Sequence, residues 1–271
     1  MSDALKIYPA TRYLVALREG GSLPAVVDTE GGGKFVLKFR GAGQGARALL
    51  AELLVGRLAQ AAGLAVPQLA LITLDAAFGR AEKDPEIQDI LQASTGINVG
   101  LRYLEGALNF DPVAGAELIS AELAARIVWL DAFMLNVDRT AHNPNMMIQQ
   151  GKLWLIDHGA AFYVHHNWQS ATKERMQKPF PLIAEHILLP HASSILDVDE
   201  DMSARIAQSL DAVVDQLPDA LLTDAPPLRP AAFASADENR TAYRNALRAR
   251  LQAPRAFVDV AENARQGARN E

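Results

Sequence analysis

Residues 136–159 read NVDRTAHNPNMMIQQGKLWLIDHG, and they join a polar loop to two short apolar segments. The loop, 136–145, is dense in acids, amides and other groups that bind protons or metals. The runs MMIQ and KLWLID flank a Gln-Gly pair, so they predict a hairpin. The second run ends in Asp157, which a glycine follows two positions later. We therefore expect Asp157 to lie at the edge of a cleft, with a flexible turn behind it.

Three side chains of this stretch have the spacing that phosphoryl transfer requires. One carboxylate must orient the attacking hydroxyl, while a second carboxylate and an amide oxygen hold magnesium. Asp138 fits the first role, and Asp157 with Asn143 fits the second, because D-x-x-x-x-N is the spacing of a kinase catalytic loop. The alternative interpretation is a polar turn, since Asp and Asn are common in turns for local reasons.

The chain upstream of the loop has the pattern of strands and one helix. Short runs of strand-forming residues alternate with glycine-rich turns, and Gly31-Gly32-Gly33 is expected to be such a turn. After Gly41–Gly45, ARALLAELLVGRLAQAAG has helical spacing and ends in a C-capping glycine. A shorter helix is expected at Asp84–Gln92, opened by Asp84-Pro85. Strands are expected at Arg12–Leu17, Ala25–Thr29, Lys34–Phe39, Leu69–Leu74 and Ile97–Leu104.

The chain downstream is mostly helical by pattern. Ala116–Leu135 carries apolar residues at a helical period, and further helices are expected near 203–217 and 237–252. Strands that precede helices in the chain predict an α+β protein with two lobes. Asp111-Pro112 marks a linker, and the boundary between the lobes is expected near residue 106.

The stretch 136–159 resembles that of the HipA-like kinase family and, more distantly, that of the phosphoinositide kinases. The similarity extends upstream to Phe35-Val36-Leu37-Lys38-Phe39 and to LAELLVGRLAQAAGLAVPQ, and covers about residues 10–165. The resemblance implies a bilobal, protein-kinase-like fold. Residues 1–106 would form a small antiparallel sheet with one helix, and residues 107–271 a mostly helical lobe with the catalytic loop.

The resemblance also assigns roles upstream of the loop. Lys38 would hold the α- and β-phosphates of ATP, and Glu52 on the next helix would pair with it. Asp157-His158-Gly159 stands where protein kinases have Asp-Phe-Gly, with His158 packing or hydrogen-bonding behind Asp157. The alternative interpretation of Lys38 is an edge-strand charge that discourages aggregation. In the phosphoinositide-kinase pattern the metal-binding amide directly precedes the apolar strand, which would favour Asn145 over Asn143.

The remaining candidates are more weakly specified. No G-x-G-x-x-G loop is present. The turn that contains Gly20, Gly21 and Ser22 stands where the phosphate-covering loop should be, and its N–H groups could bind phosphate. Arg139 is a candidate catalytic residue, and His142 could likewise touch phosphate or substrate; either could instead pair with acidic neighbours. The adenine is expected at a hinge whose backbone groups read the base. The hinge residues are Arg102, Tyr103 and Leu104.

Composition limits the classes of function. The 271 residues carry a formal net charge of −6, which argues against a broad nucleic-acid surface. There is no cysteine, so disulfides and thiolate metal sites are excluded. No signal peptide and no apolar run of roughly 20 residues is visible, so we expect a cytoplasmic protein without membrane association. His165-His166 and His191 are expected at the surface.

These observations together predict an ATP- and Mg²⁺-dependent phosphotransferase. By the resemblance, the acceptor is expected to be a Ser or Thr hydroxyl on a protein, with a small molecule or a lipid as the alternative. The rival class is a non-catalytic nucleotide-binding module that acts through an unidentified protein partner.

Overall fold

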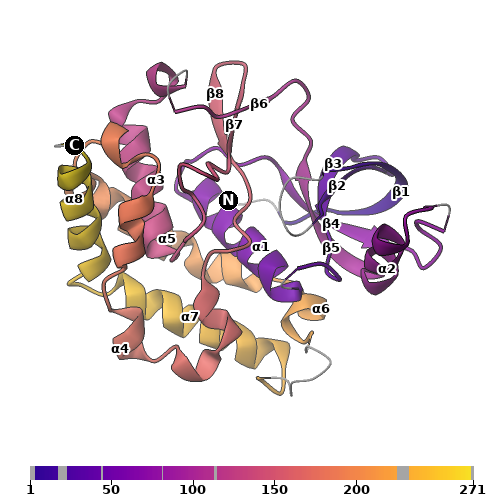
Figure 1. Ribbon diagram of the computed structural model, residues 1–271. Coiled ribbons are helices and arrows are strands. Elements are labelled where there is room, and N and C mark those ends of the chain that lie inside the picture. Colours follow the sequence, from indigo (N-terminus) through magenta and orange to yellow (C-terminus); the bar gives the residue numbers. More distant parts are fainter. Residues whose placement is uncertain are drawn as a thin grey trace.

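Five strands close into a barrel at one side of the molecule (Figure 1). The computed structural model describes residues 4–17, 23–43, 45–80, 82–112, 115–224 and 232–269. Around the barrel the strand order is β1, β2, β3, β5, β4. Their bounds are β1 Ile7–Ala16, β2 Ala25–Thr29, β3 Gly33–Lys38, β4 Leu69–Leu74 and β5 Gly96–Arg102.

The small antiparallel sheet expected from the sequence is instead a closed barrel that contains one parallel strand pair. β1 pairs in parallel with β4, from Ile7 opposite Leu71 to Pro9 opposite Thr73, and this pair closes the barrel. This pairing uses the first residues of β1, which lie before the strand predicted at Arg12–Leu17. A proline lowers the expectation of a strand because it cannot donate to the ladder. In β1 the carbonyl of Pro9 still accepts the Glu30 N–H at 2.9 Å.

The other upstream predictions agree closely with the structure. β2 and β4 have the expected bounds, β3 and β5 are shifted by one or two residues, and the triple glycine forms the turn between β2 and β3. Gly100 on β5 lies against β4, where an added Cβ would be 2.7 Å from Cγ1 of Ile72. Helix α2, Pro85–Ala93, begins where Asp84 accepts the Glu86 N–H. The helix expected after Gly45 is α1, Ala46–Ala61.

The remaining helices form the other side of the molecule, together with a three-stranded sheet. In that sheet β7 (Met146–Gln149) and β8 (Lys152–Leu155) form the expected hairpin, and β6 (Leu108–Asn109) adds to β7. The α+β class is confirmed. The helices are α3 Ala121–Phe133, α4 Lys173–Met176, α5 Ile195–Asp215, α6 Asp219–Leu222, α7 Ala236–Leu251 and α8 Ala256–Ala268.

Two of these helices differ from the expected bounds. The segment expected as one helix over Ala116–Leu135 is a short 3-10 turn followed by α3, because Ser120 caps α3 by accepting the Leu123 N–H at 3.1 Å. α5 begins at Ile195, eight residues before the expected start. Its acidic first turns are neutralised from other helices, as where Arg255 pairs with Asp199 at 2.5 Å.

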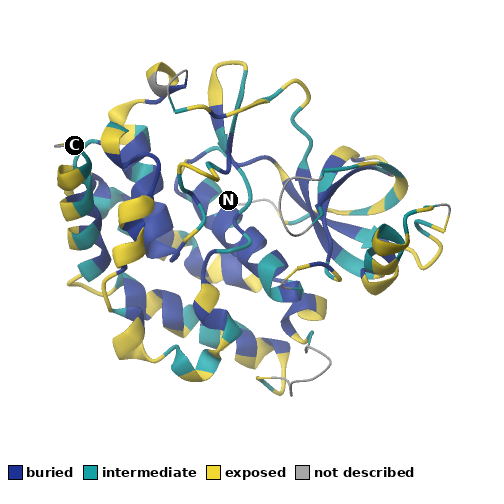
Figure 2. Cartoon of the chain, in the orientation of Figure 1, coloured by how far each residue is buried: buried dark blue, intermediate teal, exposed yellow. Residues whose placement is uncertain are grey.

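Helix α1 lies between the barrel and the other helices, and it is buried on most of its surface (Figure 2). It contacts β4 and β5 on one side and α5 and α6 on the other. Its leucines belong to a continuous hydrophobic core that also includes residues of β4, β5, α3, β8 and the C-terminal helices. A separate apolar cluster, with Phe35 and Leu37, fills the barrel.

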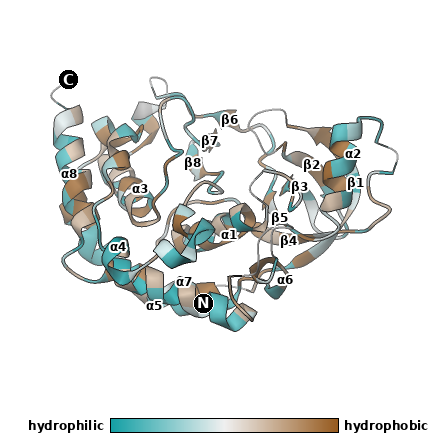
Figure 3. Cartoon of the chain, turned by 60° about the horizontal axis from the view of Figure 1, so that its bottom comes forward, coloured by the Kyte–Doolittle hydropathy of each residue, from teal (hydrophilic) through white to brown (hydrophobic). Residues whose placement is uncertain are grey.

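The outer helices mix hydrophilic and hydrophobic residues, as α5 and α8 show in Figure 3. This is the pattern of helices that cover a core with one face and meet water with the other. Among the helices of the described part of the chain, none is long and apolar enough to span a membrane.

Candidate active site

Lys38 is a buried cation at the end of β3, and it joins two carboxylates. Its Nζ lies 2.6 Å from Oε2 of Glu52 and 2.5 Å from Oδ1 of Asp157. β3 pairs with β2 on one side and β5 on the other, so Lys38 is not the edge-strand charge of the alternative interpretation. Burial alone would lower the pKa of Lys38, but the charges of Glu52 and Asp157 outweigh it and raise the pKa. The side chain is therefore a fixed positive charge.

Glu52 is the anchor of this group. It is fully buried on α1, and besides Lys38 it accepts the backbone N–H of His158 at 2.8 Å. Burial would raise the pKa of Glu52, yet Lys38 and His158 lower it well below its ordinary value. The carboxylate is thus ionised and can only accept, so Nδ1 of His158, 3.1 Å away, carries the proton that it donates to Glu52. As expected from the sequence, His158 is buried and hydrogen-bonds behind Asp157.

Asp138 lies half-buried in the polar loop, and amide groups hold it from two directions. Its Oδ2 accepts hydrogen bonds from Nδ2 of Asn143 at 2.9 Å and from Nδ2 of Asn145 at 3.1 Å. Its backbone N–H donates to Oδ1 of Asn136 at 3.1 Å. Oδ1 of Asp138 has no hydrogen-bond partner within the described ranges. One carboxylate oxygen is therefore fixed, and the other is open.

The two asparagines differ in their surroundings. Asn145 is buried and has a left-handed backbone, with φ 49°. Its carbonyl accepts the Ile156 N–H at 3.0 Å, which places Asn145 beside the residue that precedes Asp157. Asn143 is exposed, and its backbone closes a turn with Thr140. Asn145 thus connects Asp138 to the Asp157 end of the hairpin, which Asn143 does not.

Arg139, a candidate catalytic residue by sequence, adopts the alternative that the sequence also allowed and pairs with an acidic neighbour. Its side chain is buried, and its Nε donates to Oδ2 of Asp131 on α3 at 2.6 Å. The guanidinium also donates to the backbone carbonyl of Asn145. Arg139 therefore joins the loop to α3 and stabilises the loop backbone at Asn145. His142 stays exposed, with no hydrogen bond among the described residues.

Asp131 and His186 are residues that the sequence interpretation missed. Asp131 is fully buried and stands as the single charged residue in the run IVWLDAFML, 127–135. Buried acids are rare unless paired, so a lone carboxylate in an apolar helix pattern was the available signal. His186 directly follows a distant 3-10 segment, Pro181–Glu185, and nothing in the local sequence marks it as a partner of Asp131.

The expected hinge is only partly open to a ligand. The Arg102 N–H donates to the Gln68 carbonyl at 2.8 Å, and the Tyr103 N–H donates to the Lys34 carbonyl at 3.0 Å. The Arg102 guanidinium lies 4.4 Å from the centre of the Phe35 ring. These two N–H groups cannot read a base while the barrel is intact. The Leu104 N–H has no partner within the described ranges, so it is the donor that remains.

Gly20, Gly21 and Ser22 lie outside the described residues. For a metal, the available donors are oxygens: the Asp157 side chain is 42% exposed, and among the described residues its one side-chain contact is that of Oδ1 with Lys38. Carboxylate and amide oxygens suit Mg²⁺, which also keeps waters and phosphate oxygens as ligands. Within the described residues no group of three or more His, Asp and Glu side chains is arranged as a metal site.

A family model described as HipA-like kinase matches residues 13–247. The chain belongs to the HipA-like kinase family. Membership makes it a kinase-type phosphotransferase, and it confirms the resemblance drawn from residues 136–159. Among solved structures, this HipA-like kinase is similar to the crystal structure of the Helicobacter pylori proinflammatory kinase CtkA. The TM-score is 0.57 at 11% identity, over 97% of this chain and 99% of that one. No curated protein matches the chain.

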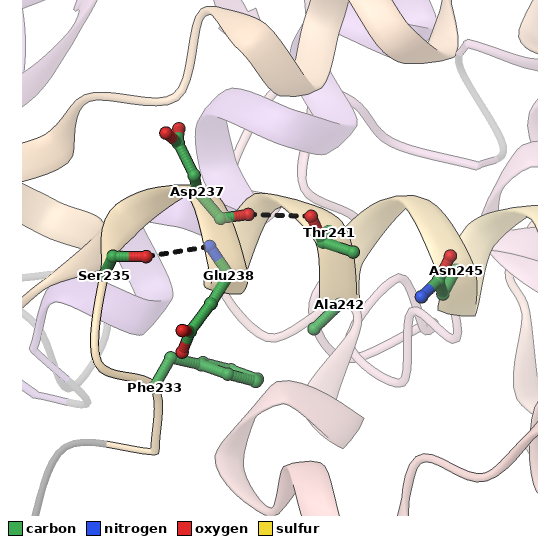
Figure 4. A pocket seen from close by; sticks show the side chains of 7 residues that line it. All are labelled: Phe233, Ser235, Asp237, Glu238, Thr241, Ala242 and Asn245. Atoms are coloured by element: carbon green, nitrogen blue, oxygen red, sulfur yellow. Dashed lines mark hydrogen bonds between the residues drawn. The ribbon is translucent and has the colours of Figure 1, made fainter.

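This HipA-like kinase also has a shallow hollow beside the first turns of α7 (Figure 4). Its polar groups serve the helix itself: Ser235 accepts the Glu238 N–H at 3.2 Å, and Thr241 Oγ1 donates to the Asp237 carbonyl at 2.8 Å. None of the residues that line it belongs to the group around Lys38 and Asp138. The hollow is therefore separate from the candidate active site.

The histidines correct one further expectation. His165 is fully buried rather than at the surface, and its Nδ1 lies 2.8 Å from the Tyr243 hydroxyl on α7. Burial, followed by the charges of His166 and Arg47, holds the pKa of His165 well below its ordinary value. His165 is thus a neutral core residue.

Proposed function

We propose that this HipA-like kinase transfers the γ-phosphate of ATP to a Ser or Thr hydroxyl of a protein. The observation that carries the proposal is the bridge of Lys38 between Glu52 and Asp157. A buried lysine held by a helix glutamate, next to an oxygen ligand for magnesium, is the arrangement with which kinases bind phosphates. We further propose two lobes that meet near residue 106, with the adenine at Leu104.

Lys38 binds the α- and β-phosphates, because its positive charge is fixed and Glu52 orients it. Asp157, whose side chain is 42% exposed beside Lys38, would supply a carboxylate ligand for magnesium. Magnesium, when bound, neutralises charge on the transferring phosphate. Asp138 accepts the hydroxyl proton of the substrate on Oδ1, since Oδ2 is held by the amides.

Asn145 is proposed as the amide ligand of the metal, in preference to Asn143. Both amide nitrogens donate to Asp138, so in both residues the amide oxygen is free to bind a cation. Asn145 is the one whose backbone is hydrogen-bonded to Ile156, beside Asp157. Loss of a metal ligand should weaken Mn²⁺ binding, followed by electron paramagnetic resonance with nucleotide present. We expect Asn145→Ala to weaken it at least tenfold and Asn143→Ala by less than about threefold, in line with typical effects at metal sites. The reverse order would return the role to Asn143.

The reaction is tested with purified protein, Mg²⁺ and γ-labelled ATP, with cell-lysate proteins, lipid vesicles or polar metabolites as acceptors. We expect label on Ser or Thr of protein, and a loss of about 10²–10⁴-fold in Asp138→Ala, the usual range for a general base. Asp215→Ala is the matched control, because Asp215 is an exposed carboxylate on α5 that pairs with Arg244. Label on lipid or metabolites alone would refute the protein acceptor. ATP binding without hydrolysis or transfer would favour the non-catalytic module.

A further inference from the structure

One buried carboxylate, that of Asp131, binds two side chains of the catalytic loop. Asp131 lies on α3, seven positions before Asp138, and its side chain is fully buried. Its Oδ1 accepts Nδ2 of Asn136 at 2.8 Å, and its Oδ2 accepts Nε of Arg139 at 2.6 Å. Burial would raise the pKa of Asp131, but the charge of Arg139 and the hydrogen bonds from His186 and Arg139 outweigh it and hold that pKa well below its ordinary value. It is therefore ionised at neutral pH.

The two side chains bound by Asp131 also form hydrogen bonds with the proposed catalytic base and metal ligand. Asn136 accepts the backbone N–H of Asp138 at 3.1 Å, which fixes the backbone from which the catalytic carboxylate projects. Arg139 donates to the backbone carbonyl of Asn145, the residue whose side-chain amide is the proposed metal ligand. Asp131 thus sets the positions of Asp138 and Asn145 through one intermediate residue each.

His186 completes the group from the other side. Its Nδ1 accepts the Leu188 N–H at 3.1 Å, so the proton of the neutral ring must sit on Nε2. That Nε2 lies 3.0 Å from Oδ2 of Asp131 and donates to it. Burial lowers the pKa of His186, which keeps the ring neutral. The backbone is joined as well, because the Ile187 N–H donates to the Arg139 carbonyl at 3.2 Å.

A buried ion pair of this kind is weak evidence for stability, since desolvation offsets the attraction. What it does provide is a single geometry for the loop, because both carboxylate oxygens of Asp131 have defined donors. We propose that Asp131 and His186 are positioning residues for phosphoryl transfer, holding Asp138 and Asn145 in register through Asn136 and Arg139. This inference rests on the proposed function.

The test compares Asp131→Asn, His186→Gln and His186→Phe with wild type. The Gln side chain keeps a donor for Asp131, whereas Phe fills the space without one. Asp199→Asn is the matched control, because it removes a part-buried carboxylate that pairs with Arg255 and accepts the Trp129 indole N–H on α3 but makes no contact with the catalytic loop among the described residues. For each variant that is folded by circular dichroism, kcat, KM for ATP and the Mn²⁺ dissociation constant by electron paramagnetic resonance are measured.

We expect Asp131→Asn and His186→Phe to lower kcat and Mn²⁺ affinity by about 10- to 100-fold, as for residues that orient ligands. KM for ATP should stay within about twofold, and His186→Gln should recover most of the loss. Asp199→Asn should change neither quantity. If Asp131→Asn does not fold, the two His186 variants decide. Folded Asp131→Asn or His186→Phe with wild-type kcat and Mn²⁺ affinity would overturn the inference. If wild type itself transfers no phosphate, the proposed function fails, and the Mn²⁺ affinities alone decide the positioning role.

Discussion

Replacement of Lys38 by methionine removes the charge and keeps most of the aliphatic stem. Glu52 is then a buried carboxylate without a cation, although the two donors of His158 remain. Asp157 is affected less, because its side chain is 42% exposed and water can replace the lost contact. The destabilisation should therefore come almost entirely from Glu52.

The size of the effect follows from the distance. Unit charges 2.6 Å apart attract by about 6 kcal/mol at an effective dielectric constant of about 20. Breaking a buried pair by removing one partner typically costs about 3–5 kcal/mol. We expect Lys38→Met to lose about that much free energy of unfolding at pH 8. Adding Glu52→Gln removes the unpaired charge, so the double variant should recover at least about 2 kcal/mol of it.

The loss should also depend on pH. Without Lys38, burial raises the folded-state pKa of Glu52 above its unfolded value. The variant then loses stability as pH rises through that pKa, so the difference from wild type should be smaller at pH 5 than at pH 8. Urea unfolding of the wild type, both single variants and the double variant at the two pH values measures this.

Arg12→Met provides the control for burial. Arg12 and Asp28 also lie 2.6 Å apart, but the Arg12 side chain is 71% exposed. The same separation at the surface should be worth only about 0–1 kcal/mol. If Lys38→Met costs no more than Arg12→Met, or if the double variant recovers nothing, the reasoning from burial is refuted.

Three further changes test other parts of the molecule. As pH falls from 6.5 to 5, the free energy of unfolding should decrease by up to about 1.4 kcal/mol per pH unit because of His165, whose pKa in the folded state is lowered by burial. Urea unfolding at several pH values should show that this dependence on pH is weaker by that amount in His165→Gln, and an unchanged pH dependence would contradict the prediction. Gly100→Ala should lower the free energy of unfolding by about 1–3 kcal/mol, because the new Cβ would lie 2.7 Å from Ile72; an unchanged Tm would show that the barrel adapts. Glu262→Gln should cost about 2 kcal/mol at pH 7, because the hydrogen bond from Arg265 and the other contacts of the ionised form lower the pKa of Glu262 to about 2; the difference from wild type should shrink as pH falls from 4.5 toward 2, and a constant difference by urea unfolding would refute this origin.

The local sequence pattern was sufficient to predict a strand or helix whose ends are set by residues within or next to it. Ala25–Thr29 and Leu69–Leu74 are apolar runs that end in turn-forming or polar positions, and both were predicted with their observed bounds. The parallel contact of β1 with β4 could not be predicted in this way. It joins residues about 64 positions apart and depends on how the barrel closes.

The residues of the candidate site also fall into those that local motifs predict and those whose positions depend on distant contacts. Lys38, Glu52 and Asp157 were expected together because each occupies a motif position, and the structure brings them together. For Arg139 the sequence left two interpretations open, because a side chain next to Asp138 could face the site or, as observed, pair with Asp131. His165 was misjudged because its partner, Tyr243, lies 78 positions away. The spacing of residues within a motif indicates their chemistry, whereas the burial of a side chain depends on segments that are distant in the sequence.

The burial of α1 limits how activity could be controlled. A helix that carries the partner of the proposed phosphate-binding lysine could act as a switch by moving outward, provided that its buried faces can be exposed to water. Here the swing would take Leu49, Leu53 and Leu54 out of the core, each at roughly 1.5–3 kcal/mol. Such a cost is comparable to the whole stability of an ordinary domain. The lysine–glutamate pair is thus a permanent part of the fold, and any on–off control has to act on another part of the molecule.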